Sequence, residues 1–234
     1  SVENPRETHR ASVEATFSLL LAARERGVRR VVYAASSSAY GDQPALPKVE
    51  TMAPAPLSPY AAAKLVGEYY CQVFTHSYKL ETVSLRYFNV FGPRQDPSSQ
   101  YSGVISRFIA ALASGETPVI YGDGEQTRDF TYVSNAVEAN LLAAESARAV
   151  GQSINVANGR QTSLNELLSV VKKLTGREEV EADYREPRVG DVRDSLADIT
   201  RARELLGYEP RVELEEGLRK TIDWWKQSRY ARNV

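Results

Sequence analysis

Cysteine and methionine are nearly absent from this chain, which has 234 residues but only Cys71 and Met52 of these types. A single cysteine excludes an internal disulfide and any metal cluster built on several cysteines, and we expect no metal site. No stretch has the apolar length of a membrane span or of a signal peptide's core. Neither sign of charge dominates, since the net charge is -1. We therefore expect neither a nucleic acid nor a membrane as a partner.

A glycine-rich loop of the kind that holds a dinucleotide is also missing. Neither G-x-G-x-x-G nor G-x-x-G-x-x-G occurs, and Gly122-Asp123-Gly124 lacks the third glycine. In dinucleotide-binding proteins this loop and the following helix N-terminus hold the pyrophosphate through backbone amides. The chain begins with Ser1 and not with methionine, so we expect the native start of translation to lie upstream.

The sequence does contain enough apolar residues for a sizeable core. Its 42% hydrophobic content suits one large domain or two small ones. Apolar spacing predicts helices over residues 8–26, 57–78, 104–113, 132–148 and 214–231, and the capping box of Ser163 and Glu166 opens another. Apolar runs predict strands over residues 31–35, 82–88, 118–121 and 153–156, the last of which returns to the main sheet. We expect buried helix faces to contain Leu65, Tyr69, Val73, Phe74, Leu218, Ile222 and Trp225.

The most informative stretch runs from residue 31 to residue 64. It starts with a short strand that we expect to be buried, and three hydroxyl side chains follow it: Ser36, Ser37 and Ser38. Ser58 before Pro59 is typical of a helix start, with an N-cap ahead of a proline at the first helical position. Tyr60 and Lys64 then lie one turn apart on one face of that helix.

Tyr60, Lys64 and Ser36 together suit proton transfer. A free tyrosine has a pKa near ~10, so a phenolate at neutral pH needs a nearby cation, which Lys64 can supply. With Ser36 donating a hydrogen bond, the three groups can take a proton from a hydroxyl while a hydride leaves the same carbon. Tyr-x-x-x-Lys alone is a weak pattern, and an ordinary exposed helical pair is the simpler alternative. Of the thirteen tyrosines, however, only Tyr60 has a lysine four positions later.

Four sequence words extend this pattern along most of the chain. They are ASSSAYGD at 35–42, SPYAAAK at 58–64, LRYFNVFG at 85–92 and GDGEQTRDF at 122–130. In this order they resemble the extended short-chain dehydrogenase/reductases, and within that family the UDP-sugar 4-epimerases. The resemblance implies an NAD-dependent enzyme that acts on a UDP-sugar. It also implies a homodimer, formed through the helix over residues 57–78 and the helix before it, and a cytoplasmic location.

The resemblance implies an α/β fold with two parts. One is a Rossmann-like doubly wound parallel sheet that binds NAD, to which we assign residues 1–92 and 132–158. The other is a smaller mixed α/β domain for the nucleotide sugar, to which we assign residues 93–131 and 159–234. Aligned on its motifs, the chain begins after the family's fourth strand, so about half of a typical dinucleotide-binding domain is expected upstream of Ser1. We expect the chain alone to bind NAD poorly.

The resemblance also assigns roles to single residues. It implies Ser36, Tyr60 and Lys64 as catalytic residues, and Ala34, Ala35, Tyr60, Lys64 and Tyr87 as contacts to NAD. It implies substrate contacts from Ser36, Ser37, Ser38, Asn89, Val104, Arg128, Arg188, Asp191 and Ser195. Without the resemblance, Arg128 beside Asp129 reads as a surface ion pair worth at most ~1 kcal/mol, and Arg188 as part of a solvated loop. The planar forks of the two arginines suit the oxygens of a pyrophosphate.

Ser195 predicts which sugar the site accepts. In the 4-epimerases the matching position borders the C2 substituent of the hexose, and a bulky side chain there tends to exclude an N-acetyl group. Serine leaves room for that group. We therefore expect the substrate pair to be UDP-N-acetylglucosamine and its galacto-epimer, and UDP-glucose with UDP-galactose stays open as a further pair.

Two other functions stay open on the sequence. A nucleotide-sugar 4,6-dehydratase uses the same three catalytic residues but normally has an acidic pair where this chain has Ser37 and Ser38. An inactive remnant that serves as an interaction module fits the missing glycine-rich loop. It also fits Ser12 and Ala15, which replace the asparagine and glycine of the family's Asn-x-x-Gly-Thr word.

Overall fold

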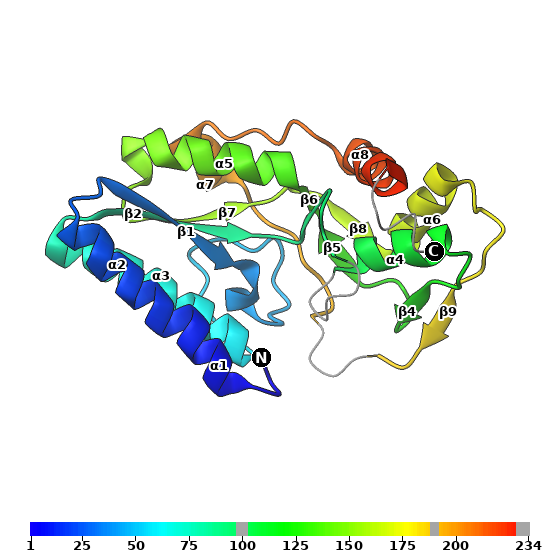
Figure 1. Cartoon of the computed structure of the whole chain (residues 1–234), viewed down its shortest axis with the longest axis horizontal. Helices are drawn as coiled ribbons and strands as arrows, with labels where there is room; N and C mark the ends of the chain where they lie inside the picture. The colour runs from blue at the N-terminus through cyan, green and yellow to red at the C-terminus, as the bar shows by residue number, and fades with distance from the viewer. Residues whose placement is uncertain (97–102, 188–191, 228–234) are drawn as a thin grey trace.

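The computed structural model describes residues 1–96, 103–187 and 192–227, and its centre is a three-stranded parallel sheet. The strands lie in the order β1-β2-β7, with bounds Arg30–Ser36, Glu81–Tyr87 and Ser153–Val156. Helices cover both faces of this sheet (Figure 1). On one face are α1 (Pro5–His9), the π-helical turn η1 (Arg10–Glu14), α2 (Ala15–Glu25) and α3 (Pro59–Tyr78). On the other are α5 (Val133–Glu145) and α7 (Thr200–Leu206).

Local signals in the sequence set the ends of these helices. The Ser58 side chain accepts a hydrogen bond from the backbone N–H of Ala61 (3.1 Å), and Pro59 is the first residue of α3, as predicted. Lys79 closes α3 in the left-handed conformation. The predicted helix over residues 8–26 is confirmed, but it starts at Pro5, where Asn4 caps the N–H of Glu7. The predicted return of residues 153–156 to the main sheet is confirmed by the parallel pairing of β7 with β2.

Two predictions about burial are wrong. Strand β1 was expected to be buried, but only its Ala35 is, while Ala34 is exposed. Within the described residues, β1 is an edge strand with β2 as its one neighbour, which leaves its other side uncovered. On α3, Leu65 and Phe74 are buried as expected, whereas Tyr69 and Val73 are 50% and 49% exposed. Tyr69 and Val73 face outward because the apolar residues of α3 extend beyond the side of the helix that contacts the sheet.

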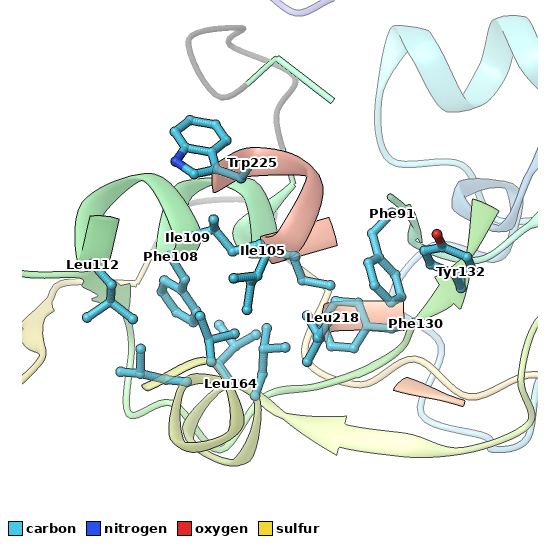
Figure 2. Close-up of a cluster of buried hydrophobic side chains, with 14 of the residues drawn as sticks. Phe91, Ile105, Phe108, Ile109, Leu112, Phe130, Tyr132, Leu164, Leu218 and Trp225 are labelled. Atoms are coloured by element: carbon cyan, nitrogen blue, oxygen red, sulfur yellow. The ribbon is translucent and has the colours of Figure 1, made fainter. Parts of the chain in front are cut away.

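A separate apolar core, shown in Figure 2, gathers side chains from residues 91–132, 164–171 and 212–225. Helices α4 (Val104–Ala113), α6 (Leu164–Thr175) and α8 (Leu214–Gln227) contribute most of it. Leu218, Ile222 and Trp225 are buried in this core, as predicted, and the capping box of Ser163 and Glu166 is present. Pairs of short strands border it: β3 (Val90–Phe91) with β6 (Thr131–Tyr132), β4 (Val119–Tyr121) with β9 (Asp183–Arg185), and β5 (Thr127–Asp129) with β8 (Gln161–Ser163). The assignment of this part as a separate domain stays a prediction.

Asp129 joins the two parts of the molecule. Its carboxylate is fully buried at the end of β5 and accepts backbone hydrogen bonds from Asn158 (3.0 Å), Gly159 (3.1 Å) and Ala197 (3.2 Å). The first two donors follow β7, and the third precedes α7. One carboxylate therefore ties β5 to the end of the main sheet and to the segment that leads into α7. Burial raises the pKa of Asp129 to about 6, although these backbone hydrogen bonds act to lower it.

This shift predicts how stability depends on pH. Because the folded pKa is about 6 and the ordinary value is 3.8, the folded protein binds more protons than the unfolded chain between these two values. The contribution of Asp129 is thus complete below about pH 4 and is lost as the pH rises through 6, on the order of 2–3 kcal/mol.

Urea unfolding of the wild type and of Asp129→Asn at pH 4.5 and pH 7 measures this contribution. We expect the free energy of unfolding of the wild type to fall between the two pH values by more than that of the variant. Equal changes in the two proteins would contradict the assignment. Asp198→Asn, at a half-exposed aspartate, is the control. Its free energy of unfolding should change between the two pH values by as much as that of the wild type.

Candidate active site

A cavity of about 550 Å³ lies at the carboxyl ends of strands β1 and β2. Residues from β1, the start of α3, the end of β2, β5 and the segment after residue 191 line it. Of the residues predicted for the site, it is lined by Ala34, Ala35, Ser36, Ser37, Ser38, Tyr60, Lys64, Tyr87, Asn89, Arg128 and Ser195. The carboxyl ends of parallel strands are where open α/β sheets bind ligands. We refer to this space as the reaction cavity.

Tyr60 and Lys64 reach the reaction cavity from the first two turns of α3. The Lys64 ammonium donates a hydrogen bond to the backbone carbonyl of Ala34 (2.9 Å) and lies 5.9 Å from the centre of the Tyr60 ring. Burial lowers the pKa of Lys64. Tyr60 is 41% exposed, which leaves its ring accessible from the cavity. The pair predicted from its spacing therefore borders the same cavity as Ser36.

The three serines form a turn at the end of β1. Ser36 is the last residue of the strand, and η2 (Ser37–Tyr40) follows as a 3-10 turn. The Ser36 oxygen accepts hydrogen bonds from the backbone N–H of Ser38 (3.2 Å) and from its hydroxyl (2.8 Å). Because both bonds use the oxygen as acceptor, the hydroxyl hydrogen of Ser36 stays available for a ligand in the cavity.

Tyr87 and Asn89 approach from the end of β2. The Tyr87 hydroxyl accepts a hydrogen bond from the Asn140 side chain on α5 (2.7 Å), and burial raises the pKa of Tyr87. Asn89 has a positive φ of 33°, a conformation that asparagine tolerates better than most residues. Its side-chain amide donates to the backbone carbonyl of Asp129 (3.1 Å). This bond fixes Asn89 at the point where the main sheet meets β5.

A second cavity, of about 430 Å³, adjoins the reaction cavity. Both are bordered by Asn89, Val90 and Arg128, so a ligand that spans them passes these three residues. Val104, a predicted substrate contact, lines only this second cavity, together with side chains of α4 and the β4 region. The Arg128 guanidinium donates to the backbone carbonyls of Thr127 (2.8 Å) and Arg193 (3.1 Å). We refer to this space as the second cavity.

Ser195 lies in a segment that several hydrogen bonds hold against β5. Its backbone N–H donates to the carbonyl of Thr127 (3.2 Å), and the Thr127 hydroxyl donates to Asp194 (2.6 Å). Arg193 makes a two-pronged ion pair with Asp123, with distances of 2.9 and 3.0 Å. Ser195 therefore faces the reaction cavity from a fixed backbone. The predicted contacts Arg188 and Asp191 lie outside the described residues.

Several residues of the reaction cavity were not predicted from the sequence. Tyr40 lines it and donates its hydroxyl hydrogen to Asn155 (2.7 Å), and the Arg86 guanidinium lies 4.9 Å from the centre of its ring. The position of Tyr40 in the motif ASSSAYGD could have indicated that it belongs to the site. Lys48 is only 2% exposed and donates to the Gln43 carbonyl. No pattern in the sequence indicated Lys48, because the segment that covers it is almost 150 positions away, at Leu196 and Asp198.

Among the residues that the structure describes, no group of three or more histidine, cysteine, aspartate or glutamate side chains is placed to hold a metal ion. None of the described helices has both the length and the apolar character to cross a membrane.

Comparison with known proteins places this site in a family. The model of the NAD dependent epimerase/dehydratase family matches residues 1–157. The UDP-glucose 4-epimerase of Mycolicibacterium smegmatis is 41% identical over 227 residues, which cover 97% of this chain and 72% of that protein. The UDP-N-acetylglucosamine 4-epimerase of Methanobrevibacter ruminantium M1, solved with UDP-N-acetylmuramic acid, is 40% identical with a TM-score of 0.93, over 97% of this chain and 72% of that one.

A second solved structure gives the same result. The UDP-glucose 4-epimerase of Thermotoga maritima, solved with UDP-glucose, is 39% identical with a TM-score of 0.93, and the match covers 97% of this chain and 73% of that one. These matches confirm the Rossmann-like α/β fold class that the sequence predicted. Together with the family model, they show that the chain belongs to the NAD dependent epimerase/dehydratase family.

Proposed function

We propose that this protein inverts the configuration at C4 of a UDP-hexose with NAD as cofactor. The observation that carries the proposal is the reaction cavity, which brings Ser36, Tyr60 and Lys64 together although they come from two different elements. The adjoining second cavity supports it, because a nucleotide sugar needs one space for the sugar and another for the nucleotide. Relatives named UDP-sugar 4-epimerases, about 40% identical, support the same activity.

The residues at the end of β1 fit the nicotinamide end of NAD. Ala34 and Ala35 line the cavity, and neither has a side chain larger than a methyl group, which leaves room for a flat ring. Lys64 and Tyr87 border the same place and offer hydrogen-bond donors. When bound, NAD supplies the hydride acceptor that the chemistry requires.

The three catalytic groups divide the proton transfer among them. Tyr60 takes the proton from O4 of the sugar and later returns it, while the Lys64 ammonium stabilises the phenolate charge. Ser36 donates a hydrogen bond to O4, using the hydroxyl hydrogen that its contacts with Ser38 leave available. Loss of a hydride from C4, for which bound NAD would supply the acceptor, leaves a 4-keto sugar, and this sugar turns over and takes the hydride back on its other face.

The diphosphate must stay bound while the sugar turns over. Arg128 and Asn89 stand where the two cavities meet, so we assign them to the diphosphate. The second cavity then holds the nucleoside, with Val104 as one of its contacts. Ser37 and Ser38 border the sugar loosely with short side chains, which suits a ligand that rotates. The roles of Arg188 and Asp191 and the cytoplasmic location stay predictions from the sequence.

Removing the phenol hydroxyl tests the proposed function. We expect Tyr60→Phe to lower kcat by about 10²–10⁴-fold, because the variant loses the hydroxyl that exchanges the O4 proton. Its Kd for the UDP-sugar should stay within about twofold, since the change removes one oxygen. Epimerisation in the intact translation product is followed by NMR of the anomeric protons, and binding by calorimetry. Tyr78→Phe, at an exposed tyrosine at the far end of the same helix, is the control. A Tyr60→Phe enzyme with near wild-type kcat would contradict the mechanism.

We further propose that Ser195 admits an N-acetyl group at C2, so that UDP-N-acetylglucosamine is a substrate. Ser195 lines the reaction cavity from a fixed backbone, and its small side chain leaves space beside the sugar. Ser195→Tyr should lower kcat/KM for the acetylated sugar by about 10- to 200-fold and change kcat/KM for UDP-glucose much less. Ser195→Ala should preserve both values. Equal losses for the two sugars would show that Ser195 does not select the substituent.

We also propose that the protein is a homodimer that pairs through α2 and α3. Their outer faces carry apolar side chains that are substantially exposed: Phe17, Leu19, Tyr69 and Val73. An apolar patch of this kind on a helix pair is typical of a subunit interface. Val73→Glu should halve the molar mass measured by light scattering, because the charge would be buried on association. Val137→Glu, at an equally exposed valine of α5, should leave the mass unchanged. A wild-type protein with the mass of one chain would contradict the proposal.

A further inference from the structure

Tyr33 lies against the Lys64 side chain on the side of strand β1. The centre of its ring is 5.3 Å from the Lys64 ammonium nitrogen, and the centre of the Tyr60 ring is 5.9 Å from the same atom. Both distances are within the ~6 Å over which an aromatic face attracts a cation. The Ala34 carbonyl, the next along β1, accepts a hydrogen bond from that ammonium group (2.9 Å). Two rings and one carbonyl therefore surround the ammonium.

The Tyr33 ring also fixes the helix that carries Lys64. Its hydroxyl donates to the backbone carbonyl of Lys64 (3.3 Å). The ring has room only because residue 67 is glycine, since a Cβ atom there would lie 2.1 Å from the Tyr33 hydroxyl and 2.3 Å from the adjoining ring carbon. Tyr33 and Gly67 thus fit each other across the contact between β1 and α3. This fit sets how closely Lys64 approaches the strand.

Tyr33 acts through its ring and not as an acid or base. Burial raises the pKa of its hydroxyl well above the ordinary range of tyrosine, so the side chain is neutral at any working pH. A neutral ring attracts the ammonium without neutralising it, so Lys64 keeps the charge that a phenolate needs beside it. A carboxylate in this position would compete with the phenolate for the same cation.

We propose that Tyr33 is a positioning residue for catalysis, whose ring holds the Lys64 ammonium beside Tyr60. The inference rests on the proposed function of Lys64 and adds a residue that the three catalytic side chains do not include. A lysine has a flexible four-carbon stem that loses much conformational freedom when it is held. Because the Coulomb energy falls with distance, an ammonium that moves away from Tyr60 stabilises the phenolate less. The ring restricts this movement before the substrate arrives.

NMR of the protein carrying 13C-labelled lysine tests the contact directly. In the wild type we expect the Lys64 ε-protons to be shifted upfield by the ring and to show nuclear Overhauser effects to the Tyr33 ring protons. A Lys64→Arg sample assigns the resonance. Tyr33→Phe should keep the shift because the ring remains, whereas Tyr33→Leu should move the resonance toward that of an exposed lysine. A wild-type protein without the upfield shift and without these effects would overturn the proposal, and this outcome does not depend on the folding of either Tyr33 variant.

Kinetics of the same variants test the role. Tyr33→Leu should lower kcat by roughly three- to thirtyfold, which corresponds to the loss of one partly desolvated cation–π contact. KM for the UDP-sugar should stay unchanged, and Tyr33→Phe should restore kcat. The proposal would be overturned if Tyr33→Leu kept kcat within twofold of the wild-type value. It would also be overturned if Tyr33→Phe lowered kcat as much as Tyr33→Leu does. A wild type that epimerises no UDP-hexose would instead overturn the proposed function, and the lysine resonance would still decide whether Tyr33 holds Lys64.

Discussion

The ion pair between Glu68 and Arg86 fastens helix α3 to strand β2, and the geometry of the reaction cavity depends on it. The two groups are 1% and 6% exposed and meet at 2.8 Å, with two further hydrogen bonds of 3.0 and 3.1 Å. The Ser153 hydroxyl on β7 donates to the same carboxylate (3.0 Å). Breaking a buried pair from one side typically costs 3–5 kcal/mol, because it leaves the other charge without a partner. The pair therefore fixes α3 against two strands at once.

Its position along α3 explains why it matters for the site. Glu68 follows Lys64 by four residues, as Lys64 follows Tyr60, so the three side chains lie on one face of the helix. Glu68, which is buried, orients that face, and Tyr60 and Lys64 reach the reaction cavity beside the end of β1. Arg86 in turn lies over the Tyr40 ring, which holds the turn that follows Ser36. One ion pair thus positions both sides of the cavity.

The sequence predicted what is encoded locally and missed what depends on distant partners. The cap at Ser58, the capping box at Ser163 and the faces of the terminal helix follow from spacing within a few residues, and all are present. The burial of β1 was misjudged because an apolar run does not show whether a strand has one neighbour or two. Lys48 was missed because the backbone that covers it belongs to residues 196–198. Most of the cavity residues that were predicted belong to the four motif words, and the spacing of Tyr60 and Lys64 linked these two residues as well.

The charges around the two cavities favour an extended anionic ligand. Lys48, Lys64 and Arg128 line the reaction cavity, and its one carboxylate among the described residues, Asp194, accepts hydrogen bonds from the hydroxyl and the backbone N–H of Thr127. The balance is cationic, and Arg128 places part of it where the cavities meet. In the proposed binding mode a diphosphate at that point contacts the Arg128 guanidinium, whereas the sugar beyond it meets Lys64 at its reacting end and the short side chains of Ser37 and Ser38 elsewhere. The cation where the cavities meet therefore acts on the part of the ligand that must stay still, and short hydroxyl side chains border the part that must turn.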